Sequence, residues 1–213
     1  PLDEPKGGWD SVTDATIVFH GAGGQDTNTD VLMSALNNEV GTSKSYETIV
    51  DWSEWSQNIL KASFVGQTIG KEIAAQLLSK AKNIETVHVI GISVGSFAAN
   101  SCIDKVKQER QKSSGDVYSQ LTLLDPFCQR GVLDLTYGDR NFGKNADYPQ
   151  QYLNTDDPVP FTNKSLSKCA CIDVTALRPT EIFGHDWPLI YYSKSKKLGL
   201  VSASDKLSIG KVY

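Results

Sequence analysis

Short apolar runs rich in β-branched residues recur along this chain, and longer segments with apolar residues every three or four positions separate them. The short runs are typical of buried strands, and the longer spacing is typical of helices with one buried face. Strands that alternate with helices favour a mainly parallel sheet with helices on both faces, so we predict a compact α/β fold. The predicted strands cover residues 16–20, 46–52, 87–90, 121–126, 151–154 and 170–175.

The helical segments lie between these strands. Residues 28–38 form an amphipathic pattern with one apolar face, which predicts a helix. Residues 59–82 predict a longer helix, and Gly66 and Gly70 mark places where it can approach the sheet closely. A third helix is expected to begin at Ser96 and to end in a charged and then Ser/Gly-rich stretch.

Three segments do not follow this alternation. Residues 1–14 are polar with Pro and Gly, which predicts an arm. Residues 128–150 have no clean period and hold three glycines, so we expect an excursion or a small lid over the functional site. The Lys- and Ser-rich tail from Ser193 predicts a last helix or an arm.

Length, charge and cysteine content narrow the class of protein. A chain of 213 residues suits a single domain over residues 1–213. The net charge of −4 without a basic run argues against a nucleic-acid partner, and no apolar stretch is long enough for a transmembrane segment. A glycosylation sequon at Asn163, together with a bridge from Cys128 to Cys169 or Cys171 if one forms, favours a secreted protein.

The strand at residues 87–90 runs directly into Gly91-Ile-Ser-Val-Gly95, and a helix of small residues follows at once. This G-x-S-x-G pattern between a strand and a helix is that of a nucleophile elbow. A sharp turn presents the hydroxyl of Ser93 outside the sheet, and side chains at the glycine positions would collide with the neighbouring strand and helix. The alternative is a Gly-rich turn of the kind found in any α/β protein.

A second glycine loop, His20-Gly-Ala-Gly-Gly24, leaves the first predicted strand. It lacks the Lys-Ser/Thr of a phosphate-binding loop, and its spacing does not fit a dinucleotide-binding loop. An oxyanion loop fits better, with Gly21 in the turn and the N–H groups of Ala22 and Val94 as donors. His20 would either brace this loop or pack at the strand end.

A nucleophilic serine needs a histidine to take its proton and an acid to hold that histidine. Of the three histidines, His88 lies inside a predicted strand, whereas His185 follows the last strand and is the candidate base. Two acids are placed equally well: Asp125 ends one strand, and Asp157 follows the next strand with Asp156 beside it. The order nucleophile, acid, histidine is the one found in α/β-hydrolases.

Several of these segments resemble the lipases of the pancreatic lipase family. The resemblance covers roughly residues 46–127 and includes Val50-Asp-Trp-Ser53, Val65-Gly66, residues 87–95 and Leu124-Asp-Pro126. It implies an α/β-hydrolase fold and carboxylic-ester hydrolysis, with Ser93 as nucleophile, Asp125 as acid and His185, before the Tyr191-Tyr192 pair, as base. Asp157-Pro-Val-Pro160 instead resembles the acid segment of fungal lipases, so the resemblance favours Asp125 without removing Asp157.

The chain also departs from that family. Ile92 stands where the family usually has a histidine, and a length of 213 residues leads us to expect no counterpart of the family's additional lipid-handling domain. A compact esterase or cutinase-like enzyme is therefore an alternative to an interfacial lipase. Trp52 and Trp55 either line an acyl pocket or pack in the core.

We therefore expect a serine esterase or lipase that forms an acyl-enzyme on a small-molecule or lipid ester and needs no metal or organic cofactor. One alternative is an acyltransferase or thioesterase with the same triad, which would pass the acyl group to another acceptor. The other is a non-catalytic binding protein on a hydrolase scaffold.

Overall fold

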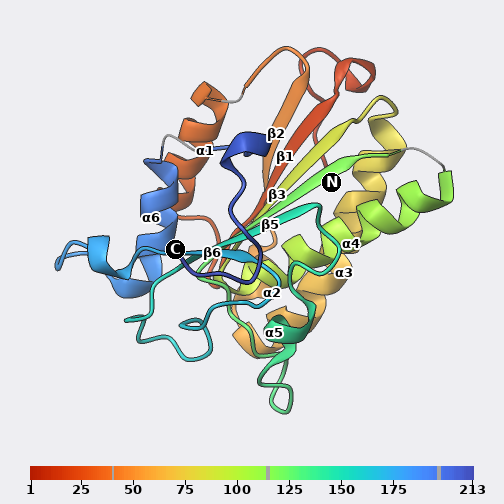
Figure 1. Cartoon of the computed structure of the whole chain (residues 1–213). Coiled ribbons are helices and arrows are strands. Elements are labelled where there is room, and N and C mark those ends of the chain that lie inside the picture. Colours follow the sequence, from red (N-terminus) through yellow and green to blue (C-terminus); the bar gives the residue numbers. More distant parts are fainter. Residues whose placement is uncertain (40, 114–115, 196–197) are drawn as a thin grey trace.

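The computed structural model describes residues 1–39, 41–113, 116–195 and 198–213. Within these residues, six parallel strands form one sheet in the order β2-β1-β3-β4-β5-β6, which confirms the predicted parallel α/β architecture (Figure 1). The strands are β1 (Asp14–Phe19), β2 (Ser45–Val50), β3 (Thr86–Ile92), β4 (Tyr118–Leu124), β5 (Tyr148–Leu153) and β6 (Ala170–Asp173).

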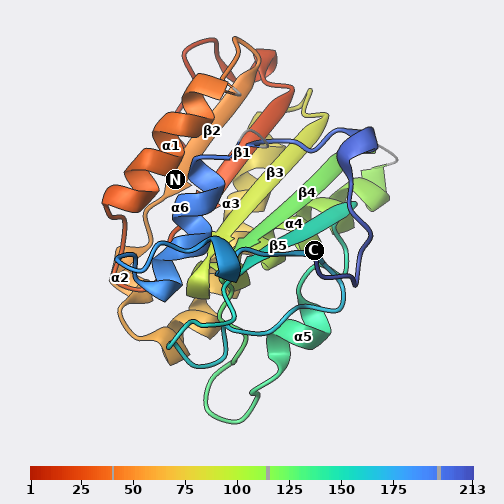
Figure 2. The same ribbon diagram turned by 60° about the vertical axis from the view of Figure 1, so that its left-hand side comes forward.

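Helices cover both faces of the sheet. Figures 1 and 2 show α1 and α6 on one face and α3 and α4 on the other. Right-handed crossovers explain the positions of α1, α3 and α4, because the chain moves in one direction from β1 to β2 and in the opposite direction from β2 to β3 and on to β4. The last helix, α6, follows β6 and returns to the face that α1 covers. The helices are α1 (Thr27–Glu39), α2 (Ser53–Ser56), α3 (Ile59–Lys80), α4 (Ser96–Ser113), α5 (Tyr137–Asn141) and α6 (Trp187–Ser193).

Two hydrophobic clusters fill the space on either side of the sheet. Consecutive strand residues fall into different clusters: Ile17 belongs to the first and Val18 to the second, and Val89 and Ile90 divide in the same way. Side chains alternate across a strand, so a strand buried on both faces must be apolar at successive positions. This requirement explains the continuous apolar runs in the sequence.

The close approach of α3 is to α4 and not to the sheet, which corrects the expectation for Gly66 and Gly70. A Cβ atom on Gly70 would lie 2.0 Å from the carbonyl oxygen of Ala98 in α4. A Cβ atom on Gly66 would lie 3.3 Å from the ring of Trp52 and 3.5 Å from the nitrogen of Ala98. The absence of side chains at these positions lets the two helices touch along their backbones.

The ends of the chain pack onto this core. Leu2 and Val12 are buried, and the N–H of Leu2 donates to the Gln76 side chain, so residues 1–14 are an arm that lies against the domain. The last residues lie along β6, where the N–H of Tyr213 donates to the carbonyl of Cys171 at 2.9 Å. Of the two expectations for the tail, the described residues therefore support the arm.

Residues 128–150 contain α5 and the first part of β5. Gly138 packs against Cys128, where an added Cβ would come within 2.7 Å of the sulfur. All four cysteines are buried free thiols, so the bridge from Cys128 to Cys169 or Cys171 is not formed. None of the helices among the described residues is both long and apolar enough to cross a bilayer.

The direction of the connections reverses between two neighbouring strands. β1 and β3 pair in the centre of the sheet, but the chain leaves β1 toward one edge and β3 toward the other. Open α/β sheets bind their ligands at such a reversal, outside the carboxyl ends of the strands. The loop after β1 and the turn after β3 both lie there.

Candidate active site

The turn after β3 holds Ser93 in a strained backbone conformation. β3 ends at Ile92, a 3-10 turn covers Ser93–Gly95, and α4 begins at Ser96. Ser93 has φ of 51°, in the left-handed region that costs a residue with a side chain about 1–2 kcal/mol. Such strain is often kept where a side chain must be held in one orientation for function.

Both glycines of the pattern are required by their surroundings. A Cβ atom on Gly91 would lie 2.7 Å from the Cα of Ser96, and one on Gly95 would lie 2.4 Å from the carbonyl oxygen of Phe19. These are the predicted collisions with the following helix and the neighbouring strand. The turn is therefore tight enough to place Ser93 between β1 and the first turn of α4.

The loop after β1 passes directly beside Ser93. A Cβ atom on Gly21 would lie 3.3 Å from the Cβ of Ser93. Ala22 lines the same pocket as Ser93, and its N–H has no hydrogen-bond acceptor among the described residues. Val94 is fully buried behind the turn and does not line this pocket.

His20 both packs at the strand end and braces this loop, so the two expectations for it hold together. Its Nδ1 lies 2.9 Å from the carbonyl oxygen of Gly21, and its Nε2 accepts from the backbone N–H of Trp52 at 3.2 Å. The indole N–H of Trp52 donates to the carbonyl of His20 at 3.1 Å. Burial lowers the pKa of His20, which keeps the ring neutral.

The two tryptophans do not line the pocket that holds Ser93. Trp52 is buried between His20 and α3, where it supports the glycine loop. Trp55 is partly exposed, with the Lys61 ammonium 5.4 Å from its ring centroid. The packing alternative is therefore correct for Trp52, and the acyl-pocket hypothesis fails for both residues at this pocket.

His185 contacts both candidate acids. It lies in a 3-10 turn, Gly184–Asp186, immediately before α6. Its Nδ1 is 2.9 Å from Oδ2 of Asp125 and 2.7 Å from Oδ2 of Asp157. Carboxylates accept hydrogen bonds, so Nδ1 carries the proton and Nε2 is left as the basic nitrogen.

The two acids come from neighbouring strand ends. Asp125 follows β4 with φ of 48°, and its Oδ1 accepts from the N–H of Asn154 at 3.2 Å. Asp157 lies in the loop after β5, where Oδ1 accepts from the N–H of Val159 at 3.0 Å and Oδ2 accepts from the hydroxyl of Thr162. Asp157 therefore receives more donors than Asp125.

Two residues beside the acids differ in their contacts with the site: Asp156 makes none with His185, whereas Asn154 is hydrogen-bonded to the backbone of the turn that holds His185. Asp156 is exposed, and no hydrogen bond joins its carboxylate to His185 among the described residues. Asn154 is fully buried and connects the acids to the histidine turn, because its Nδ2 donates to the carbonyl of Gly184 at 2.9 Å. Its position directly after β5 was the only sequence signal for this role.

Burial and hydrogen bonding shift the pKa values of these three groups in different directions. Burial opposes charge on His185, but the two carboxyl groups outweigh it and raise the pKa of His185 to about 9. Burial raises the pKa of Asp125 to about 7, and Asp157 adds to this rise while the hydrogen bond to His185 opposes it. Burial also acts on Asp157, but the hydrogen bonds that it accepts hold its pKa well below the usual range.

Ser93 and His185 line one pocket of about 210 Å³. Gly21 and Ala22 border it, which brings the predicted nucleophile, base and oxyanion loop together. No hydrogen bond joins the Ser93 hydroxyl to His185 in the part of the chain that the structure describes; such bonds often tighten only when substrate binds. The remaining lining residues are Gly24, Asp26, Thr29, Ile59, Ile92, Val159, Asp186 and Leu189.

Among the described residues, Asp125, Asp157 and His185 form the one cluster of metal-ligand type, with ligand atoms within 4.8 Å of one another. Nδ1 lies 2.9 Å from the Asp125 carboxylate and 2.7 Å from the Asp157 carboxylate, and both are ordinary hydrogen-bond distances. The donor set therefore fits a hydrogen-bonded network better than a metal site.

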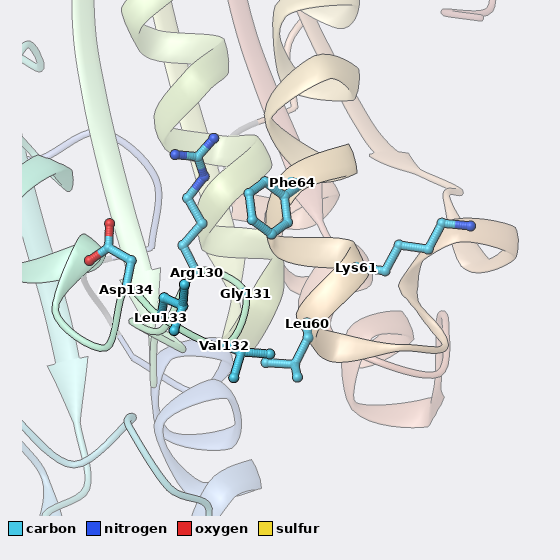
Figure 3. Close-up of a pocket in the computed structure, with 8 residues that line it drawn as sticks. All are labelled: Leu60, Lys61, Phe64, Arg130, Gly131, Val132, Leu133 and Asp134. Atoms are coloured by element: carbon cyan, nitrogen blue, oxygen red, sulfur yellow. The ribbon is translucent and has the colours of Figure 1, made fainter.

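A second cavity, of about 460 Å³, opens between α3 and the loop after β4 (Figure 3). Leu60 and Phe64 form one wall, and Val132 and Leu133, which are 71% and 96% exposed, form the other. The guanidinium of Arg130 lies 4.6 Å from the ring centroid of Phe64. This groove is apolar and open, and it does not include Ser93.

A search with the sequence finds no matching protein-family model and no matching curated protein. The function is therefore inferred from the site.

Proposed function

We propose that this protein is a serine hydrolase of carboxylic esters built on an α/β-hydrolase fold. The observation that carries the proposal is the left-handed conformation of Ser93 at the strand-to-helix turn, in the pocket that His185 also lines. An exposed hydroxyl does not require such strain, whereas a nucleophile that must be held in one orientation does. The order of Ser93, the two acids and His185 along the chain is that of this fold.

Each group has a role in acyl transfer that follows from its contacts. The carboxylates hold Nδ1–H of His185, which leaves Nε2 to take the proton of Ser93 as the hydroxyl attacks the ester carbonyl. The N–H of Ala22, which lines the pocket, then stabilises the oxyanion, and the N-terminus of α4 adds a favourable dipole. His185 passes the proton to the leaving alcohol, and water repeats the sequence to release the acid.

The size of the pocket favours short acyl groups. Its volume of about 210 Å³ is below the range of about 300–1,000 Å³ that is typical of ligand sites. The larger apolar groove lies beside α3 and is not part of this pocket. We therefore expect a compact esterase in preference to a lipase that acts on long chains.

The test is hydrolysis of p-nitrophenyl esters from acetate to palmitate by the wild type, Ser93→Ala and Ser96→Ala. Ser96 is the matched control, because it begins α4, its buried hydroxyl has no partner among the described residues and it does not line the pocket. We expect Ser93→Ala to lose kcat by up to about 10⁶-fold and Ser96→Ala to retain it.

The same samples are treated with a fluorophosphonate probe. Labelling of the wild type and of Ser96→Ala, but not of Ser93→Ala, is the expected result. Full activity in Ser93→Ala, or a folded wild type that neither reacts with the probe nor cleaves any ester, would refute the proposal.

A further inference from the structure

The Nδ1 of His185 lies within hydrogen-bond distance of two carboxyl groups, although one is enough to orient an imidazole. Both acids are buried, with side-chain exposures of 2% for Asp125 and 0% for Asp157. Their oxygens lie within 4.8 Å of each other and of Nδ1. Among the described residues, His185 is the only basic side chain that is hydrogen-bonded to these carboxyl groups. The arrangement therefore places two buried carboxyl groups against a single imidazole N–H.

Two buried carboxylates at this separation do not both ionise readily, because each raises the free energy of charging the other. One proton is then held between them, and the pair titrates as a unit. The hydrogen bonds identify the carboxyl group that holds it. Asp157 accepts from Val159, Thr162 and His185, whereas Asp125 accepts from Asn154 at 3.2 Å and from His185.

We propose that Asp125 and Asp157 form an acid pair that shares one proton and positions His185 jointly, so that either carboxylate can hold Nδ1–H when the other is removed. The proton resides mainly on Asp125, and the charge resides mainly on Asp157. When Nε2 takes the proton of Ser93, the carboxylate that holds Nδ1–H stabilises the imidazolium that forms. The catalytic part of this inference rests on the proposed function.

Removing one acid should then recruit the other. In Asp157→Asn the charge beside Asp125 is gone, so Asp125 ionises and takes over the hydrogen bond to Nδ1. In Asp125→Asn the ionised Asp157 stays in place. Only the double variant leaves Nδ1–H without a carboxylate, and loss of the acid from a serine triad costs about 10⁴-fold in kcat.

The first readout is kcat/KM on p-nitrophenyl acetate for the wild type, the two single variants and the double variant. We expect each single variant to lose less than about 100-fold and the double variant to lose about 10⁴-fold. Asp156→Asn is the matched control, because Asp156 neighbours Asp157 in the chain but is exposed, and it should keep wild-type activity. One single variant as inactive as the double variant, with the other unaffected, would overturn the joint role.

The second readout needs no ester. The pKa of His185 is measured by ¹H–¹⁵N NMR of the imidazole, with its signal assigned by comparison with His185→Gln. We expect this pKa to stay above that of a free histidine in the wild type and in both single variants, and to fall in the double variant. The other acids near His185 are Asp186, next in the chain, and Asp26, and Asp186→Asn should lower the pKa by less than the double substitution does.

The two readouts separate the two inferences. Joint control of the His185 pKa without esterase activity would leave the acid pair standing and refute the proposed reaction. Esterase activity with a His185 pKa that depends on one acid alone would refute the acid pair and leave the reaction standing.

Discussion

Replacing Gly70 by alanine should loosen the contact between α3 and α4. The added methyl would lie 2.0 Å from the carbonyl oxygen of Ala98 and 3.0 Å from the nitrogen of Cys102, and both are backbone atoms that cannot rotate away. Overpacking of this kind costs about 1–3 kcal/mol, and so close an approach belongs at the upper end. Alanine in a helix recovers about 1 kcal/mol relative to glycine, so the net loss should be about 2 kcal/mol.

Gly66→Ala is the control for this prediction, because it lies one turn earlier in α3 and gains the same helix propensity. Its methyl would meet the Trp52 ring at 3.3 Å, which a small shift can accommodate. Urea unfolding followed by circular dichroism should show Gly70→Ala less stable than the wild type by about 2 kcal/mol and Gly66→Ala within about 1 kcal/mol of it. Thermal unfolding should show a Tm lower by about 4–8 °C for Gly70→Ala. Equal effects at the two positions would refute the argument from backbone contact.

Three further predictions follow from the site and the core. The kcat/KM for ester hydrolysis should rise with pH along an ionisation near 9, because only neutral His185 accepts the Ser93 proton and its pKa is raised to about 9; a limb centred near 6.5 would contradict this. No thiol should react with Ellman's reagent in the folded protein at pH 8 and all four should react in urea, because burial raises the pKa of every cysteine; fewer than four in urea would indicate a disulfide. Asn154→Ala should lower stability by about 1–3 kcal/mol and reduce kcat more than it changes KM, because the carbonyl of Gly184 loses its donor; a wild-type kcat would argue against a positioning role.

The sheet and the serine turn could be predicted because both leave a local signal. A strand buried on both faces needs an unbroken apolar run, and the collisions at Gly91 and Gly95 leave no room for a side chain. Both constraints involve residues that are close in the chain or that lie on adjacent strands. They are therefore visible in the pattern of residue types.

Contacts between loops leave no such signal. The sequence offered Asp125 and Asp157 as alternatives, and only the separation of two strand ends decides that both reach His185. Gly66 and Gly70 likewise predict a close approach of α3 to a neighbouring element, but their sequence pattern does not distinguish the sheet from α4. The sequence also does not show that the indole N–H of Trp52 donates to the carbonyl of His20, a contact that places this residue in the core and away from the pocket.

The last residues of the chain bear on how the protein behaves at high concentration. The carbonyl of Lys211 accepts from Cys171, and the N–H of Asp173 donates to the carbonyl of Tyr213 at 2.9 Å, so the tail occupies the open side of β6. An uncovered edge strand offers its free N–H and C=O groups to other chains and promotes aggregation. The tail thus covers the edge strand, and a chain without these residues would be expected to associate with itself edge to edge even if the pocket around Ser93 were intact.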